Sequence, residues 1–249
     1  MPICSRHTES EGDMLLSLAG LIVEVKNKHK YIENLAADYT VSDGVPDFSV
    51  EVTEADIERE RELSEYEFGI GYLESIAAYR KIAERLPEYG AVVFHGAVIA
   101  EGTEAYAITA RSGVGKTTHV SLWQTAFGDK VHILNGDKPI LRVIDGKVYA
   151  AGTPWRGKEG YGVSEMLPLA VVGFLERAKE PSAMPISKDA AMVRFASQIY
   201  IPSTPRGASL ALTTLGNIMN SVGLYEIRAN MDVSSAVVSY NAFKNYKKI

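Results

Sequence analysis

The sequence predicts an α/β fold in which a mixed β-sheet is flanked by helices and preceded by a small N-terminal α+β lobe. From residue 91 onward, apolar segments of strand length alternate with segments of helical periodicity. The first ninety residues mix short β-branched segments with one long amphipathic helix. A glycine-rich loop joins a strand to a helix near residue 110. We therefore expect two domains, an N-terminal lobe over residues 1–89 and a larger loop-containing domain over residues 90–249.

The N-terminal lobe has both strand and helix patterns. Residues 14–25 are typical of one or two strands, and residues 48–52 alternate as another strand after an Asp-Gly turn. The pattern over residues 31–41 is ambiguous, and the charged stretch 54–67 indicates a solvated helix or loop. Apolar side chains at helical spacing predict a helix over residues 70–86 that ends at a proline.

The second part of the chain alternates strands and helices. Strands are expected at residues 91–100, 105–109, 131–134, 139–144, 147–151, 169–176 and 223–228. Helices are expected at residues 116–126, 187–198, 207–220 and from about residue 232 onward. This order predicts the mixed sheet.

Composition excludes several classes of protein. Asp and Glu number 31 against 26 Lys and Arg, a net charge of −5, which argues against a general nucleic-acid binder. No apolar run approaches the ~18 residues of a membrane span, and the polar N-terminus lacks the apolar stretch of a secretory signal. Cys4 is the only cysteine, so a disulfide framework is excluded and a cysteine-based zinc site is not expected. We expect a cytoplasmic protein with no nucleic-acid or membrane partner.

The most informative segment is the glycine loop, residues 110–117, with the sequence ARSGVGKT. It fits the phosphate-binding pattern G-x-x-x-x-G-K-[ST] at every position except the first, where Ala110 replaces glycine. Small residues let successive backbone N–H groups surround a phosphate, and the following helix adds its positive end. We expect the nucleotide to be held by Ser112, Gly113, Val114, Gly115, Lys116, Thr117 and Thr118. The alternative is a glycine-rich turn without a ligand.

Two residues of this loop have specific expected roles. Lys116 is expected to reach the β- and γ-phosphate oxygens as a point charge. The Thr117 hydroxyl is expected to bind Mg²⁺, which takes few protein ligands. Ala110 requires a negative φ at its position, whereas glycine would be free.

A carboxylate for the same site follows the next predicted strand. Asn135-Gly136-Asp137 comes directly after the apolar residues 131–134. The Asp137 carboxylate could hold Mg²⁺ or accept a proton from an attacking hydroxyl. The alternative is an ordinary Asn-Gly turn.

Three motifs follow one another along the chain: Phe94-His95-Gly96, the glycine loop and Asn135-Gly136-Asp137. In this order they resemble the HPr kinase/phosphorylase family, whose catalytic fold is shared with phosphoenolpyruvate carboxykinase. The resemblance covers roughly residues 90–200 and implies a phosphoenolpyruvate carboxykinase-like catalytic core, ATP with Mg²⁺ as cofactors, and a possible homo-oligomer. The family has an Asp-Asp pair where this chain has Gly136-Asp137, so Asp137 is expected to serve both as base and as metal ligand.

The resemblance extends to further candidate site residues. The stretch 152–159 (GTPWRGKE) is similar to a segment of shorter, stand-alone HPr-kinase-like proteins. It places Arg156 and Lys158 where they would stabilise charge on the transferred phosphoryl group; the alternative is a basic surface loop with Trp155 packed beneath it. His95 is expected near the γ-phosphate, or else as a packed strand histidine, and His119 is expected to be structural.

These observations predict an ATP-dependent kinase that transfers the γ-phosphoryl group to a hydroxyl. The resemblance favours a serine of a small carrier protein or peptide, or a free small molecule, and the residues do not select among these acceptors. The missing acid at Gly136 leaves a non-catalytic ATP-binding regulator open. A third alternative is a phosphate-loop ATPase of another class that would use Glu176 and Arg177 at the end of a buried strand.

Overall fold

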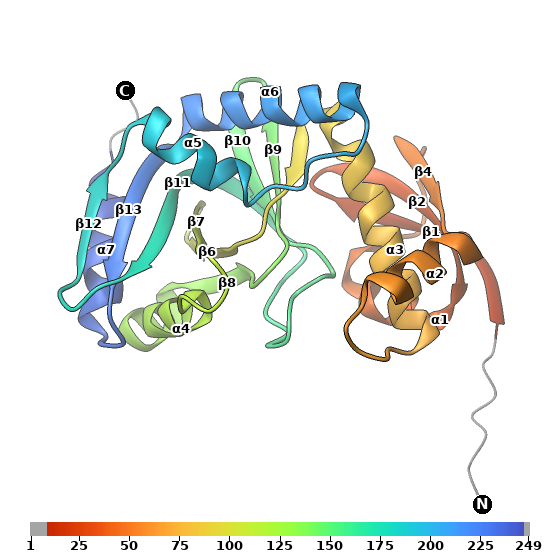
Figure 1. Cartoon of the computed structure of the whole chain (residues 1–249), viewed down its shortest axis with the longest axis horizontal. Coiled ribbons are helices and arrows are strands. Elements are labelled where there is room, and N and C mark those ends of the chain that lie inside the picture. Colours follow the sequence, from red (N-terminus) through yellow and green to blue (C-terminus); the bar gives the residue numbers. More distant parts are fainter. Residues whose placement is uncertain (1–8, 247–249) are drawn as a thin grey trace, which may run out of the picture.

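The computed structural model describes residues 9–246, which form two β-sheets with helices between and around them (Figure 1). Residues 1–8, with Cys4 among them, and 247–249 lie outside this range. The N-terminal sheet has the strand order β3-β1-β2-β4. Its strands are β1 (Glu9–Leu18), β2 (Leu21–His29), β3 (Thr40–Val41) and β4 (Phe48–Glu51).

Three helices accompany this sheet: α1 (Lys30–Leu35), α2 (Glu54–Leu63) and α3 (Ile70–Arg85). The charged stretch predicted as a helix or loop is α2, and it starts where the side chains of Thr53 and Asp56 each bond the other's backbone N–H. The apolar face of α3 packs on the sheet, burying Leu73, Ala77 and Ile82. A short 3₁₀ turn (Leu86–Tyr89) ends in Gly90, whose φ of 66° lies in the left-handed region that favours glycine.

The second sheet is mixed and has nine strands. Seven of them follow the order β5-β9-β10-β11-β7-β6-β8; in addition, β13 pairs with β11, and β12 pairs with β13. Its strands are β5 (Ala91–Val93), β6 (Ala97–Glu101), β7 (Glu104–Thr109), β8 (His132–Asn135), β9 (Ile140–Ile144), β10 (Lys147–Ala151), β11 (Met166–Arg177), β12 (Ser182–Pro185) and β13 (Gly223–Ala229). The long strand β11 runs parallel to β7 on one side and to β13 on the other. The predicted α/β class with a mixed sheet is therefore confirmed.

Helices cover both faces of this sheet. They are α4 (Lys116–Phe127), α5 (Lys188–Ala196), α6 (Pro205–Ser221) and α7 (Ser234–Lys244). One apolar core lies under α5 and α6 and includes Phe195 and Leu215; another lies under α4 and α7 and includes Trp123 and Phe243. Among the described residues, no helix is long and apolar enough to cross a membrane.

The core of the N-terminal sheet continues into the second sheet. Val93, Ile140 and Trp155 belong to the same buried cluster as the side chains of α3 and β2. Apolar packing thus crosses residue 90, and the division of the chain into domains at residues 89 and 90 stays a prediction.

The structure differs from the sequence expectations at a few elements. The ambiguous stretch contains most of α1, and β12 was not predicted, because both are short and lack a clear period. The apolar run 91–100 is not one strand but two, β5 and β6, separated at His95 and Gly96. The hairpin of β9 and β10 turns at Asp145-Gly146 as predicted, with φ of 48° and 73°.

Candidate active site

Three segments of the chain meet at one edge of the second sheet. The glycine loop follows the end of β7, and Asn135-Gly136-Asp137 follows the end of β8. Because β6 is antiparallel to both strands, β7 and β8 point the same way and their C-terminal ends share this edge. The turn before β6 brings His95 to the same place, since Ala97 pairs with Ile108 near the end of β7.

The glycine loop bends through two residues that need glycine's freedom. Gly113 and Gly115 have φ of 76° and 115°, both in the left-handed region. The non-glycine residues with positive φ in the described chain are Ala19 and Asp145, so Ala110 keeps the negative φ expected for it. An alanine therefore fits the first position of this loop without backbone strain.

The loop leads into α4 with backbone donors at its mouth. The His119 N–H bonds the Gly115 carbonyl, so the N–H groups of Lys116, Thr117 and Thr118 precede the first intrahelical bond and have no acceptor within the helix. The positive end of the helix dipole lies at the same point. This is the arrangement that binds an anion.

Arg177 holds the loop from the neighbouring strand. Its Nε donates to the Val114 carbonyl at 2.9 Å, and its Nη2 donates to the Gly113 carbonyl. The parallel pairing of β11 with β7 carries Arg177 past the end of β7 toward the loop. Arg177 thus binds carbonyl oxygens of the loop and occupies none of its N–H groups.

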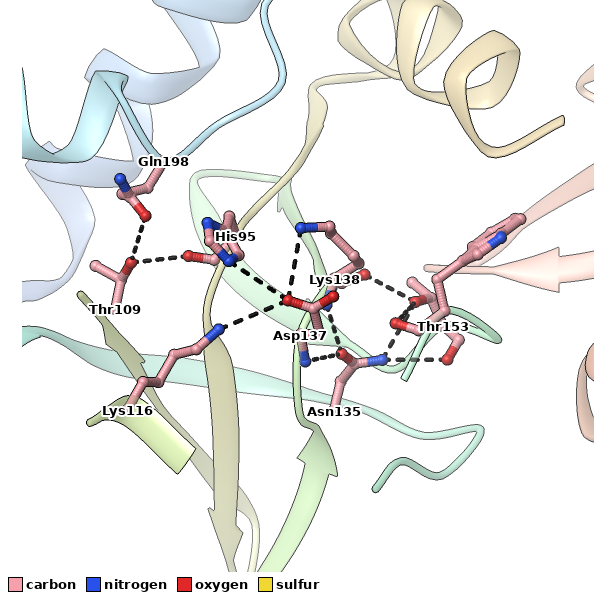
Figure 2. Close-up of polar contacts among 9 residues, drawn as sticks. His95, Thr109, Lys116, Asn135, Asp137, Lys138, Thr153 and Gln198 are labelled. Carbon is pink, nitrogen blue, oxygen red and sulfur yellow. Dashed lines mark hydrogen bonds and ion pairs between the residues drawn. The ribbon is translucent and has the colours of Figure 1, made fainter. Parts of the chain in front are cut away.

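The Asp137 carboxylate is the centre of the site (Figure 2). Its Oδ1 lies 3.5 Å from the His95 Nε2, 3.7 Å from the Lys116 Nζ and 3.5 Å from the Lys138 Nζ. The three side chains come from three different segments and converge on one oxygen (Figure 2). The sequence analysis did not single out Lys138. Its position directly after Asp137 was the one signal that could have indicated it.

A buried asparagine shapes the bend that presents Asp137. The Asn135 Oδ1 accepts the N–H groups of Asp137 at 2.9 Å and Lys138 at 2.8 Å. Its Nδ2 donates to the Thr153 carbonyl at 3.1 Å, and the Thr153 hydroxyl donates to the Lys138 carbonyl at 2.7 Å. The turn after β8 is therefore fixed by side chains, and the Asn-Gly signal in the sequence is part of the site's scaffold.

Burial and positive charge act on the ionisable groups around Asp137. Burial, with Lys138 and Lys116 nearby, lowers the pKa of His95 to about 4, so the imidazole is neutral at pH 7. Burial also lowers the pKa of Lys116, while Asp137 opposes that change. Thr109 and Gln198 support His95, because the Thr109 Oγ1 lies 2.8 Å from the His95 carbonyl and the His95 N–H donates to the Gln198 carbonyl.

The two cations predicted on the loop after β10 differ in their surroundings. Arg156 donates to the Asp38 carboxylate at 2.7 Å and stacks over the Tyr39 ring, so it bridges to the N-terminal sheet. Lys158 is exposed. Trp155 is buried beneath this loop, and its Nε1 donates to the Ser75 carbonyl of α3. The roles of Arg156 and Lys158 toward a phosphoryl group stay predictions.

Gly136 stands in a crowded place. A Cβ at this position would lie 3.1 Å from the Arg156 carbonyl oxygen and 3.5 Å from the Tyr161 Cβ. A side chain in its place would require the loop that follows β10 to shift by a few tenths of an ångström. The close packing of residues 156–161 against Gly136 therefore favours glycine at this position and leaves the bend with one carboxylate, that of Asp137.

A cavity of about 880 Å³ opens over these groups. Nearly every site residue named from the sequence lies on its wall: His95, Ser112, Gly113, Gly115, Lys116, Thr117, Thr118, Asp137, Arg156 and Lys158. Val114 is absent from the wall, because its side chain packs against the core under α4. The opposite wall comes from α1 and α3 and includes Tyr31, Tyr72 and Tyr79, which the sequence did not indicate.

The donor set suits Mg²⁺ that is held mainly by phosphate oxygens. Within residues 9–246, no group of three or more His, Cys, Asp or Glu side chains could hold a metal ion on its own. Thr117 and Asp137 offer one hydroxyl and one carboxylate at the glycine loop and beside it. A magnesium ion bound with a nucleotide uses one or two such ligands together with phosphate oxygens and water.

Comparison with known proteins leaves the function of this chain open. No protein-family model matches the sequence, and no curated protein matches it. Among solved structures, the chain is similar to the Hpr(Ser) kinase/phosphatase from Coxiella burnetii, with 10% identity and a TM-score of 0.32. The matched region covers 61% of this chain and 94% of that one. A likeness at this level carries no argument about activity, which rests on the geometry of the site.

Proposed function

We propose that this protein is a phosphotransferase that moves the γ-phosphoryl group of Mg·ATP to a hydroxyl group. The convergence of Lys116 and Asp137 at the mouth of the glycine loop carries the proposal, with the two groups 3.7 Å apart on the wall of one cavity. Phosphoryl transfer to a hydroxyl needs a base and a charge-neutralising cation close together, because this reaction depends on positioning and electrostatics.

The loop and the start of α4 would hold the triphosphate. The N–H groups of Lys116, Thr117 and Thr118 point out of the first turn of α4, and the Lys116 ammonium supplies a positive charge near Asp137. Thr117 and Asp137 would hold the magnesium ion, which neutralises charge on the phosphate oxygens when bound. His95, being neutral, can share a hydrogen bond with Asp137 or with a phosphoryl oxygen without adding charge.

The transfer itself balances with the groups present. The acceptor's oxygen forms a bond to the γ-phosphorus, the bond from that phosphorus to the bridging oxygen breaks, and ADP leaves with the electron pair. The hydroxyl proton passes to the Asp137 carboxylate. Lys116 and Lys138, which lie beside that carboxylate, counter the negative charge of the phosphoryl group and of Asp137.

Replacing Lys116 tests the phosphate-binding role. Lys116→Ala should lower Mg·ATP affinity or turnover by about tenfold or more, because it removes the charge that faces the β- and γ-phosphates. Isothermal titration with Mg·ATP and a thermal unfolding scan without ligand measure the two effects. The exposed Lys147 on β10 gives a matched control, Lys147→Ala, which should leave affinity unchanged. Unfolding of the unliganded Lys116→Ala variant would instead make Lys116 a structural residue.

A non-catalytic ATP-binding regulator is the second candidate function. The observation that favours it is the tight packing at Gly136, which leaves one carboxylate where two would share the work. Single-turnover transfer from labelled ATP to hydroxyl acceptors separates the two functions. Transfer that is present in the natural protein and lost in Asp137→Asn supports the kinase; Mg·ATP binding without transfer to any acceptor supports the regulator.

The ATPase alternative receives less support from the contacts of its residues. The Glu176 carboxylate pairs with Arg194 at 3.0 Å and is not part of the cavity wall, so it is not aimed at the phosphate loop. Arg177 is engaged with the loop's own carbonyl groups.

A further inference from the structure

Four aromatic side chains form a continuous row that leaves the cavity along the N-terminal part of the molecule. Tyr31 meets Tyr72 edge to face at 5.9 Å, Tyr72 meets Phe68 at 4.5 Å, and Phe68 meets Tyr66 at 6.3 Å between ring centroids. We call Tyr31, Tyr66, Phe68 and Tyr72 the aromatic track. It joins α1, α3 and the connection between α2 and α3.

The outer end of the track is open to solvent. The exposed fraction is 73% for Tyr66 and 43% for both Phe68 and Tyr31. Exposed aromatic residues in contact with one another indicate a binding surface, whereas isolated ones do not.

The inner end of the track lines the cavity that holds the candidate base. Tyr31 and Tyr72 lie on the cavity wall together with Asp137. Burial raises the pKa of Tyr72, and the neighbouring Tyr31 and the negative charge of Asp137 add to that rise.

The track lies on the acceptor side of the site. In-line transfer puts the leaving oxygen and the attacking oxygen on opposite sides of the γ-phosphorus. In Figure 2, Lys116 lies on one side of Asp137 and Thr153 lies on the other. Residues next to Thr153 lead to α3, because Trp155 packs on Tyr79 at 5.2 Å. The wall formed by α1 and α3 is therefore reached from the Thr153 side of Asp137, away from Lys116.

Charge changes sign between the cavity and the outer track. Cations outnumber carboxylates on the cavity wall, which carries Arg111, Lys116, Lys138, Arg156, Lys158 and Arg177 against Asp137 and Glu159. The outer track is interleaved with the exposed carboxylates Glu62, Glu65 and Glu67, which take part in no ion pair within residues 9–246. The phosphates of a nucleotide are repelled there, and a cationic apolar segment is attracted.

We infer that the aromatic track is the docking surface for the phosphoryl acceptor, and that this acceptor is a polypeptide segment in which apolar and basic residues flank the hydroxyl-bearing residue. The inference rests on the proposed function. A free hydroxy amino acid would occupy a small part of the cavity and leave Tyr66 and Phe68 without a contact, whereas a peptide chain can extend from Asp137 to the exposed end. Rings supply apolar contact, and Glu65 and Glu67 supply the charge that selects basic neighbours.

Fluorescence anisotropy with three labelled serine peptides tests the inference on the full chain, with and without a non-hydrolysable Mg·ATP analogue. The first peptide carries lysines and phenylalanines around its serine, the second has glutamates in place of the lysines, and the third has alanines in place of the phenylalanines. The first should bind most tightly. The double substitution Tyr66→Ala and Phe68→Ala should weaken binding of the first peptide by roughly tenfold. Tyr66→Phe keeps the ring and should bind this peptide as tightly as the natural protein does.

Charge reversal gives the sharper test. Glu65→Lys together with Glu67→Lys should invert the ranking, so that the glutamate peptide binds better than the lysine peptide, by about threefold for each reversed charge. Leu212→Ala on α6, far from α1 and α2 in Figure 1, is the matched control for removing an exposed apolar side chain and should change nothing.

Several results would overturn the inference. They are equal binding of the three peptides, an unchanged ranking after charge reversal, full competition by free L-serine, or a dimer by sedimentation velocity that Phe68→Ala dissociates. The last result would make the track a contact between copies of this chain. A separate Mg·ATP titration of the natural protein distinguishes the two kinds of failure. If the protein does not bind Mg·ATP, the proposed function is wrong. If it binds Mg·ATP but binds the three peptides equally, only the acceptor assignment is wrong.

Discussion

Gly157 comes closer to Asp137 than any side chain would allow. A Cβ at Gly157 would lie 2.9 Å from the Asp137 Cβ, and its φ of +77° is in the left-handed region. Gly160 has a similar φ of +69° but open space around the same position. The two glycines therefore share a backbone requirement and differ only in contact with the candidate base.

This difference gives a matched pair of variants. Gly157→Ala and Gly160→Ala should each lower the free energy of unfolding by about 1 kcal/mol, because alanine is strained at positive φ. Only Gly157→Ala should also slow phosphoryl transfer, by roughly tenfold or more, since it pushes Asp137 out of position. Urea unfolding and single-turnover assays measure the two effects. Equal loss of phosphoryl transfer in both variants would mean that the contact between residue 157 and Asp137 does not determine the transfer rate.

His119 lies buried between α4 and α7, as the sequence led us to expect of a structural histidine. Its Nε2 is 3.0 Å from the Ser239 hydroxyl, which also accepts the Trp123 indole N–H. Burial lowers the pKa of His119 to about 4, against an ordinary value of 6.5. The unfolded chain therefore binds a proton more readily than the folded chain between pH 6.5 and 4.

Stability should consequently depend on this residue in acid. The contribution is fully present above pH 6.5 and is lost as the pH falls toward 4, by about 3 kcal/mol in all. His119→Gln should remove the part of the acid slope that His119 contributes and leave the part from His95, whose pKa is also lowered to about 4, whereas His132→Gln, at an exposed histidine, should retain both parts. Unfolding free energies at pH 4, 5.5 and 7 measure the difference, and parallel slopes for the two variants would contradict the assignment.

At the scale of elements, one buried carboxylate joins β2 and α1 to α3. The Glu74 side chain accepts the N–H of Lys28 at 2.7 Å and the N–H of His29 at 3.0 Å. The two donors are the last two residues of β2 and stand directly before Lys30, where α1 begins. Glu74 thus fixes the wall of the cavity that carries the inner end of the aromatic track.

Removing this carboxylate should loosen the junction. Glu74→Ala should cost about 3 kcal/mol of unfolding free energy, because both N–H groups lose the acceptor that they use in a part-buried place. The matched control is Glu88→Ala, which breaks an exposed ion pair with Arg85 and should cost less than about 1 kcal/mol. Denaturant unfolding and hydrogen exchange at residues 28–31 measure the effects, and similar costs for the two variants would refute the buried role of Glu74.

At the scale of the whole molecule, the N-terminal sheet and the second sheet share apolar packing and polar links. Trp155 packs on Tyr79 of α3, Arg156 pairs with Asp38, and the Tyr200 hydroxyl donates to Glu84 at 2.9 Å. These contacts connect residues more than seventy positions apart in sequence. The cavity lies between the two parts, so the same contacts define its width.

Unfolding should accordingly occur in a single transition. The chain has two tryptophans, of which Trp123 lies in the core under α4 and Trp155 in the core of the N-terminal sheet. In the variants Trp123→Phe and Trp155→Phe, the remaining indole fluorescence should change at the same denaturant concentration as the far-ultraviolet circular dichroism. Separate midpoints for fluorescence and dichroism would show that the two parts unfold independently and would favour the predicted boundary at residues 89 and 90.

The sequence by itself determined the local elements: the helix of residues 70–85, the turn at Asp145-Gly146, and the strand–loop–helix unit whose helix begins at Lys116. These follow from periodicity, glycine and proline, which act over a few residues. Only the tertiary structure decided that Lys138 and Arg177 join Asp137 and the glycine loop, and that Tyr31 and Tyr72 face them across the cavity. Such contacts depend on strand order and on the packing of α1 and α3, which no local pattern encodes.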